Sequence, residues 1–321
     1  MEDRKRRVKV VAMNAFSEIT LSGLQSTPRN RASCLKFIPP PPAPLDPETK
    51  TRRYQHPAYM SNIPDEACQA SHKPPRSRLP EAESLTLALS LGKQVGYGRV
   101  GRVYEVEVDE TASSSSLSGR VLPPLVVKVS RRGMASALLP EAQTYADMER
   151  LQGNVIPRCY GVFTTTIKNK RTFLPWDEEG LDEDGCTPPD YVDANLMKGP
   201  LPPNAVTILV LERVGSPIEL DQQPQRTLDE LRAMYTDIAS MGILHCDIRQ
   251  KNILYAPAHS PIPVSTSPNW TRPYRFRIID FHKSRTTNIN KYQIAVDYYA
   301  NLVRFIDGLV NGDVFEPWHR Y

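Results

Sequence analysis

The chain has 321 residues, 40% hydrophobic and 24% charged, which excludes a fibrous or wholly disordered protein. No apolar run approaches the ~20 residues that span a bilayer, and the apolar stretch after the basic start is too short for a secretory leader, so we expect no membrane association. Five cysteines without a C-x₂-C pair indicate neither a zinc ribbon nor a disulfide scaffold, and they favour an intracellular protein, cytoplasmic or nuclear.

The net charge of +4 belongs to the N-terminal segment. Residues 1–85 contain 14 Lys and Arg against 9 Asp and Glu, whereas residues 86–321 contain 26 and 27. Since the larger part has no basic field, no nucleic-acid partner is expected. Residues 1–85 also contain twelve prolines and no sustained period, so we predict a disordered, basic, proline-rich tail. Docking of a partner on this proline-rich tail is the sharper interpretation, beside a plain solvated segment.

Regular structure is predicted from about residue 86. Alternating valines over 99–108 predict a strand, joined by a glycine turn to an apolar strand at 84–91. Residues 111–119 read as a flexible loop and 125–129 as a buried strand. A helix over 140–152 has Pro140 in its first turn and Gly153 after its end.

The second half is predicted to contain a long loop, three strands and two helices. An acidic, Gly- and Pro-rich insertion at 166–205 reads as a loop, followed by a buried strand at 206–211. Thr227 and Glu230 form a capping box that predicts a helix start at Thr227. Short strands are expected at 253–255 and 276–279. Helical spacing of apolar residues predicts a last long helix through Ile294, Tyr298, Leu302, Phe305 and Leu309.

A glycine-rich turn is the first candidate site. Residues 96–103 fit the pattern G-x-G-x-x-G-x-V, with Gly96, Gly98, Gly101 and Val103 at the fixed positions. Glycines allow a backbone to approach phosphate oxygens closely. A plain hairpin with a glycine-rich turn has the same pattern. A dinucleotide-binding unit is disfavoured, because the turn leads into a strand and not into a helix.

Lysine and acidic residues near buried strands are the other candidates. Lys128 stands in an apolar strand, where an ammonium is costly unless paired, and Glu141 is its candidate partner; an edge-strand lysine reaching water is the alternative. Asp247 precedes Asn252 by five residues in a loop, which suits a carboxylate that accepts a hydroxyl proton and an amide that binds a hard cation. Asp280 follows a buried strand, a common position for a metal carboxylate.

In this order the motifs resemble those of the protein-kinase superfamily, in the style of kinase-like proteins of filamentous fungi, over roughly residues 86–310. The resemblance implies that the glycine turn covers ATP and that Lys128 pairs with Glu141. It also implies that Asp247 is the catalytic base, and that Asn252 and Asp280 hold Mg²⁺.

Further roles come from the resemblance alone. Residues 211–214 look like the hinge that holds adenine, which places Glu212 and Val214 at the nucleotide. Arg249 stands where serine/threonine kinases have a lysine that meets the γ-phosphate. Asp297 resembles the residue that bonds the backbone of the catalytic loop.

Two departures from the family pattern bear on function. Cys246 replaces the Arg of H-R-D, and His282 replaces the Gly of D-F-G. Only 41 residues follow Asp280, so a curtailed C-terminal lobe is expected.

The sequence therefore predicts an α+β, two-lobed, protein-kinase-like domain over 86–321, with lobes at 86–214 and 215–321, behind the disordered tail. The implied function is ATP- and Mg²⁺-dependent phosphoryl transfer to a hydroxyl, as in a serine/threonine protein kinase. The alternatives are a small-molecule kinase and a pseudokinase that serves as a binding scaffold.

Overall fold

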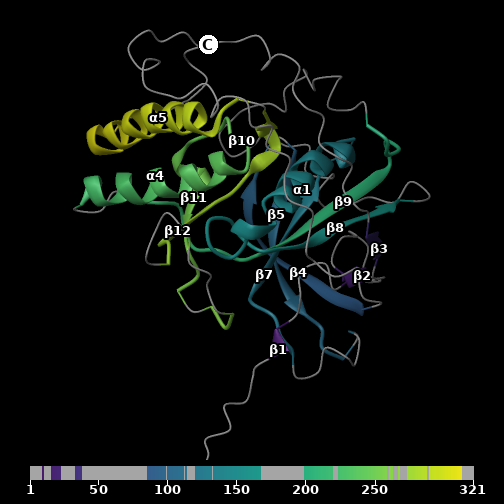
Figure 1. Ribbon diagram of the computed structural model, residues 1–321. Coiled ribbons are helices and arrows are strands. Elements are labelled where there is room, and N and C mark those ends of the chain that lie inside the picture. The colour runs from purple at the N-terminus through teal and green to yellow at the C-terminus, as the bar shows by residue number, and fades with distance from the viewer. Residues whose placement is uncertain are drawn as a thin grey trace, which may run out of the picture.

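The computed structural model describes most of the chain from Leu85 to Gly312 together with three short N-terminal strands. The described residues are 9–10, 16–22, 33–37 and 85–312, with gaps at 99, 112, 114–119, 132, 168–198, 220–222, 259, 263–266, 268–272 and 288. They form a mixed α+β structure in which a curved sheet lies beside a mainly helical part (Figure 1).

A five-stranded antiparallel sheet is the centre of the first part. In spatial order its strands are β4 (Leu85–Tyr97), β5 (Gly101–Val108), β7 (Leu125–Ser130), β9 (Ala205–Glu212) and β8 (Cys159–Thr166). These bounds confirm the strands predicted at 99–108, 125–129 and 206–211. Most of the predicted loop at 166–205 lies outside the described residues.

Two N-terminal strands close this sheet into a barrel. Strand β2 (Phe16–Ser22) pairs in parallel with β4, and β3 (Ser33–Phe37) pairs antiparallel with both β2 and β8. The prediction of a disordered tail over residues 1–85 is therefore wrong for residues 16–22 and 33–37. Each segment is short, and its hydrogen-bond partners lie far along the chain, so an average over 85 residues does not reveal it. Strand β1 (Lys9–Val10) pairs in parallel with β6 (Arg120–Val121).

The alternation of side chains along β7 divides the core in two. Val127 and Val129 belong to an apolar cluster with residues such as Tyr160 and Phe163, whereas Val126 belongs to the cluster that includes the helices. Because successive side chains of a strand point to opposite faces, Lys128 lies on the same face as Val126. Lys128 therefore points toward the helix that follows.

That helix is α1 (Leu138–Asp147), between the 3₁₀ turns η5 (Ala135–Ala137) and η6 (Glu149–Leu151). It has Pro140 in its first turn, as predicted, but it ends before residue 152 because the chain tightens into η6. The apolar cluster that includes Leu139 and Tyr145 of α1 continues into α4 and α5. One core therefore joins the sheet to the helical part.

The helical part is built on two long helices that pack against each other (Figure 1). They are α4 (Pro224–Ser240) and α5 (Lys291–Asn311), and α5 buries the face predicted for the last helix. Asn290 caps α5 by accepting the backbone N–H of Tyr292 at 2.8 Å. Within the described ranges, no helix is both long and apolar enough to cross a membrane.

The predicted capping box at Thr227 is wrong, because α4 begins three residues earlier, at Pro224. Proline is favoured in the first turn of a helix, where its missing N–H costs nothing. Glu230 instead forms an ion pair with the Arg275 guanidinium, 2.7 Å from Nε, and Thr227 Oγ1 accepts from the same guanidinium at 3.1 Å. A long-range contact has replaced the local one.

Short elements between the two helices carry the residues of interest. Strand β10 (Ile243–Leu244) pairs with β13 (Arg285–Thr286), and β11 (Ile253–Tyr255) pairs with β12 (Phe276–Ile278), both antiparallel. The 3₁₀ turn η7 (Gln250–Asn252) precedes β11, and η8 (Phe281–Lys283) follows β12. The strands predicted at 253–255 and 276–279 are thus present, the second one residue shorter.

Candidate functional site

The glycine turn joins β4 to β5 at the edge of the barrel. The backbone N–H of Gly98 donates to the carbonyl of Gly101 at 2.9 Å. A Cβ on Gly101 would lie 2.5 Å from the carbonyl oxygen of Val129, so that position requires glycine. Gly96 and Gly98 have room for a Cβ, with nearest atoms at 3.5 and 3.8 Å. Close backbone approach within the fold therefore explains Gly101 but leaves the other two glycines open to a functional explanation.

Lys128 makes two short ion pairs inside the protein. Its Nζ lies 2.7 Å from Glu141 Oε2 on α1 and 2.7 Å from Asp280 Oδ1, and 10% of the side chain is exposed. Burial lowers the pKa of Lys128, but the two carboxylates outweigh it and raise the pKa above its ordinary value. The predicted pairing with Glu141 is confirmed. The edge-strand alternative is wrong, because β7 lies between β5 and β9.

Val103, the last position of the glycine pattern, lies opposite Lys128 in the β5–β7 register. Its side chain is half-buried and packs against the core cluster shared with the helices. The backbone pairing therefore brings Val103, the glycine turn and Lys128 to one end of the sheet.

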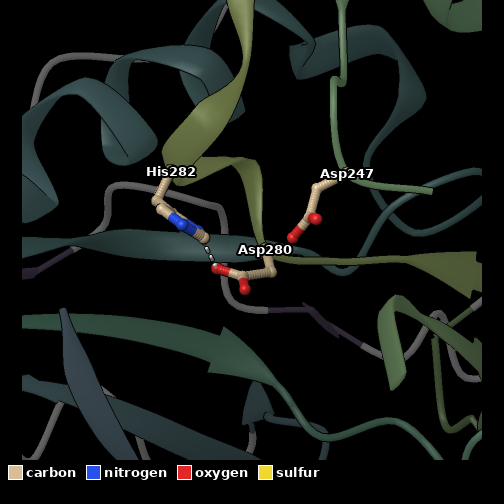
Figure 2. A group of neighbouring side chains, drawn as sticks. All are labelled: Asp247, Asp280 and His282. Carbon is tan, nitrogen blue, oxygen red and sulfur yellow. Dashed lines mark hydrogen bonds and ion pairs between the residues drawn. The ribbon is translucent and has the colours of Figure 1, made fainter. Parts of the chain in front are cut away.

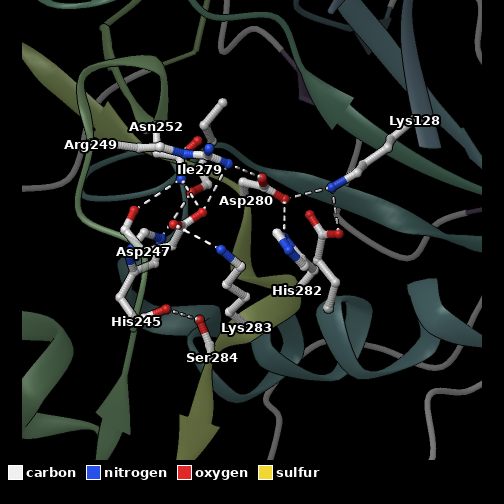
Figure 3. A network of polar contacts seen from close by, with 11 residues as sticks. Lys128, His245, Asp247, Arg249, Asn252, Ile279, Asp280, His282, Lys283 and Ser284 are labelled. Carbon is white, nitrogen blue, oxygen red and sulfur yellow. Dashed lines mark hydrogen bonds and ion pairs between the residues drawn. The ribbon is translucent and has the colours of Figure 1, made fainter. Parts of the chain in front are cut away.

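Asp247 and Asn252 come together in the loop between β10 and β11, as their spacing predicted. Asn252 Nδ2 donates to Asp247 Oδ2 at 2.9 Å and to the Asp247 carbonyl at 3.0 Å. Arg249 Nη2 lies 3.0 Å from Asp247 Oδ2, and Lys283 Nζ lies 3.3 Å from Oδ1. The Asp247 carboxylate, with no exposed side-chain surface, is thus held between an amide and two cations (Figure 3).

Asp280 follows β12 with a left-handed backbone, φ 66°. Its Oδ1 accepts from Lys128 and lies 2.8 Å from His282 Nδ1, while its Oδ2 lies 3.7 Å from Arg249 Nη2. Burial alone would raise the pKa of this carboxyl group, but Lys128 and His282 hold it well below its ordinary value. Asp280 is therefore ionised at neutral pH and joins the Lys128 pair to the Asp247 loop (Figure 3).

His245 and Tyr298 anchor the loop that carries Asp247. Tyr298 Oη accepts the backbone N–H of His245 at 2.6 Å and donates to the Ile243 carbonyl at 2.9 Å. His245 Nε2 lies 3.0 Å from the Ile279 carbonyl; because a carbonyl only accepts, Nε2 carries the hydrogen. Burial lowers the pKa of His245, which keeps the ring neutral. Asp297, to which the resemblance gave this supporting role, is exposed, so that assignment is wrong.

Phe281 locks the segment after Asp280 into the core. Its ring meets Tyr145 of α1 edge-on at 5.1 Å between centroids and His245 at 5.0 Å. One aromatic stack therefore connects α1, the Asp247 loop and η8. It fixes the positions from which Glu141, Asp247 and His282 extend.

The two hinge residues differ in what they can offer. The Glu212 carboxylate is buried and forms an ion pair with Arg158 Nη1 at 2.8 Å, so this side chain is committed to the interior. Val214 lies between Arg213 and Gly215, whose N–H groups donate to Pro124 and Tyr255 carbonyls. No hydrogen bond joins the Val214 backbone to another residue of the described ranges. Val214 therefore keeps backbone groups for a ligand.

Two residues of the cluster were not among the predicted site residues. Nitrogen or oxygen atoms of Asp247, Asp280 and His282 lie within 4.8 Å of one another, and Figure 2 shows the three side chains converging. The two residues are His282 and Lys283. In the sequence, His282 was noted only as a departure from the family pattern, and Lys283 was not considered. Their orientation depends on η8, and nothing in the local sequence pattern indicates that turn.

No protein-family model matches the chain, and no curated protein is similar to it. The assignment of function therefore depends on the residues of the site.

Proposed function

We propose that the chain is an ATP-dependent phosphotransferase with the two-lobed, kinase-like fold, which moves the γ-phosphoryl group of ATP to a hydroxyl of a protein. The observation that carries the proposal is the position of Lys128, whose ammonium joins Glu141 on α1 to Asp280 after β12. Glu141 lies 13 residues after Lys128 and Asp280 lies 152 residues after it. Pairing of their charges offsets the cost of burying all three groups. Such pairing of a lysine with a helix glutamate is required of active kinases.

Nucleotide binding is assigned to the end of the sheet that carries the glycine turn. Gly96 and Gly98 leave space beside the backbone, which suits the approach of phosphate oxygens. Lys128 supplies the cation for those phosphates, and the backbone of Val214 supplies hydrogen-bonding groups for the base. The Glu212 carboxylate takes no part in this set, because Arg158 holds it.

Asp280 and Asn252 fit the oxygen ligands that Mg²⁺ requires. Asp280 is ionised, since the pKa of its carboxyl group is held low, and Asn252 contributes an amide oxygen because its Nδ2 is directed to Asp247. Bound there, Mg²⁺ would neutralise charge on the phosphates. The protein's own part is to orient these two ligands, and it orients Asn252 through the hydrogen bond to Asp247.

Asp247 is assigned as the base for the acceptor hydroxyl. As the acceptor oxygen bonds to the γ-phosphorus, the bond to the β–γ bridging oxygen breaks, ADP leaves with that electron pair, and the hydroxyl proton passes to Asp247. We assign the proton to Oδ1, because its contact with Lys283, at 3.3 Å, is longer than the contacts that Oδ2 makes with Asn252 and Arg249. Arg249, 3.0 Å from Oδ2, orients the carboxylate and lies near enough to Asp280 to meet a phosphate.

A second candidate is a pseudokinase that binds a nucleotide or a partner without transfer. The observation that favours it is the saturation of both carboxylates: Arg249 and Lys283 bind Asp247, and Lys128 and His282 bind Asp280. A carboxylate that already has two such partners is a weaker base and a weaker metal ligand. In this case the proline-rich N-terminal segment would dock the partner.

ATP binding tests the part that both candidates share. Isothermal titration of the full chain with ATP and Mg²⁺ should show one site, and ATP at 100 times its Kd should stabilise the fold by about 2.7 kcal/mol. Asp280→Asn should weaken binding, whereas Asp297→Asn, the same change at an exposed position, should leave it unaltered. Equal effects of the two substitutions, or no binding by the unaltered protein, would contradict the proposal.

A further inference from the structure

His282 is directed into the site from the turn η8. Its Nδ1 lies 2.8 Å from Asp280 Oδ1, and 15% of the side chain is exposed. Phe281 fixes this turn between the Tyr145 and His245 rings, so the imidazole is held by its neighbours in sequence and in space. The family pattern has glycine here, which would offer no side chain at all.

The distances suit a shared ion. The ligand atoms of Asp247, Asp280 and His282 lie within 4.8 Å of one another, and opposite ligands of a small divalent ion are about 4.2 Å apart. Two of the three side chains are carried on one rigid turn after β12, and the third lies on the facing loop (Figure 2). An ion held by Asp280 and His282 would therefore lie beside Asp247, which keeps its proposed role as the base.

The hydrogen bond to Asp280 determines which nitrogen is available. Nδ1 is the ring nitrogen that faces Asp280, 2.8 Å from Oδ1, so an ion shared by the two residues would take the place of the hydrogen in this contact. The ring then carries its hydrogen on Nε2, and the lone pair of Nδ1 is the nitrogen donor.

We propose that His282 gives the metal site of this chain a nitrogen ligand, so that the site prefers Mn²⁺, or another divalent transition metal, to Mg²⁺. Imidazole suits transition metals, whereas Mg²⁺ takes oxygen ligands almost exclusively. The inference rests on the proposed function for the role of Asp280 as a metal ligand. It goes further in assigning the nitrogen donor and the class of ion.

Binding and spectroscopy test this without any measurement of transfer. The full chain is titrated with Mn²⁺ and with Mg²⁺, in the presence and absence of ATP. Electron spin-echo spectra of bound Mn²⁺ are recorded on unlabelled protein and on protein with ¹⁵N-histidine. We expect tighter binding of Mn²⁺ than of Mg²⁺ and a nitrogen coupling that changes with the histidine label.

The variants are His282→Asn and, as a matched control on the neighbouring strand, Arg285→Gln, whose side chain is exposed. His282→Asn should lower the Mn²⁺ affinity by about 10- to 100-fold and abolish the coupling, with little change for Mg²⁺. Arg285→Gln should change neither. If His282→Asn melts at a lower temperature, His282→Gln provides a second variant without an imidazole.

The outcomes separate this inference from the proposed function. Bound Mn²⁺ without histidine coupling, or equal affinities for the two ions, overturns the inference even if ATP binds. Histidine coupling in a protein that binds no ATP overturns the proposed function and leaves the metal ligand assigned. Absence of Mn²⁺ binding with and without ATP overturns the inference as well.

Discussion

Replacing Lys128 by methionine tests the energetics of the central ion pairs. The substitution keeps the length of the side chain and removes the ammonium from Glu141 and Asp280, each 2.7 Å away. Asp280 keeps His282 and Arg249 as partners, but Glu141 is almost fully buried and has no other ion-pair partner among the described residues. Removing one partner of a buried pair costs about 3–5 kcal/mol, and we expect the lower end because Asp280 stays compensated.

The loss of stability should depend on pH. Burial already raises the pKa of Glu141 above its ordinary value of 4.5, and removing Lys128 raises it further. The folded protein then keeps the Glu141 carboxyl group protonated to a higher pH than the unfolded chain does. The free energy of unfolding of the variant therefore falls as the pH increases above 4.5. The deficit relative to the unaltered protein should be small at pH 5 and largest at pH 8.

Urea unfolding of the full chain at the two pH values measures this deficit. Lys128→Met combined with Glu141→Leu should recover most of it, because an apolar pair replaces the unpaired buried charge. A deficit below about 0.5 kcal/mol, the ordinary range for surface substitutions, would refute the reasoning. So would a deficit of equal size at pH 5 and pH 8.

Three further predictions concern the scaffold. Gly101→Ala should lower the free energy of unfolding by more than about 1 kcal/mol, because its Cβ would meet a strand carbonyl oxygen, whereas Gly96→Ala should be tolerated. Equal costs of the two substitutions in urea unfolding would contradict this. A chain that begins at residue 83 should melt at a lower temperature than the full chain, since it lacks the two strands that close the barrel; an unchanged transition would show that they contribute nothing. Tyr298→Phe should lower the free energy of unfolding by about 2 kcal/mol, because the buried N–H of His245 loses its acceptor. A change near zero in urea unfolding would show that Tyr298 does not support the loop.

The sequence predicted those features that depend on local pattern. The β-branched residues at 125–129 located β7, and the cost of an unpaired ammonium there predicted the partner of Lys128, Glu141 on α1. The five-residue spacing of Asp247 and Asn252 brought their side chains into contact, because the short turn η7 between them returns the chain.

The features that sequence missed depend on distant partners. Glu230 has the spacing of a capping box, but Arg275 binds it from 45 residues away. Glu212 matches the hinge position, yet the Arg158 guanidinium draws its carboxylate into the core. His282 and Lys283 reach Asp280 and Asp247 only because η8 turns directly after a left-handed residue.

Transfer of the γ-phosphoryl group is the reaction in which Asp247 would act as the base. Purified full-length protein is incubated with γ-labelled ATP, Mg²⁺ or Mn²⁺, and both protein and small-alcohol acceptors. We predict transfer to a protein hydroxyl, a loss of about 100-fold or more in Asp247→Asn with ATP affinity retained, and no loss in Asp297→Asn. Undiminished transfer by Asp247→Asn, or ATP binding without any transfer by the unaltered protein, would contradict the assignment of Asp247 as the catalytic base.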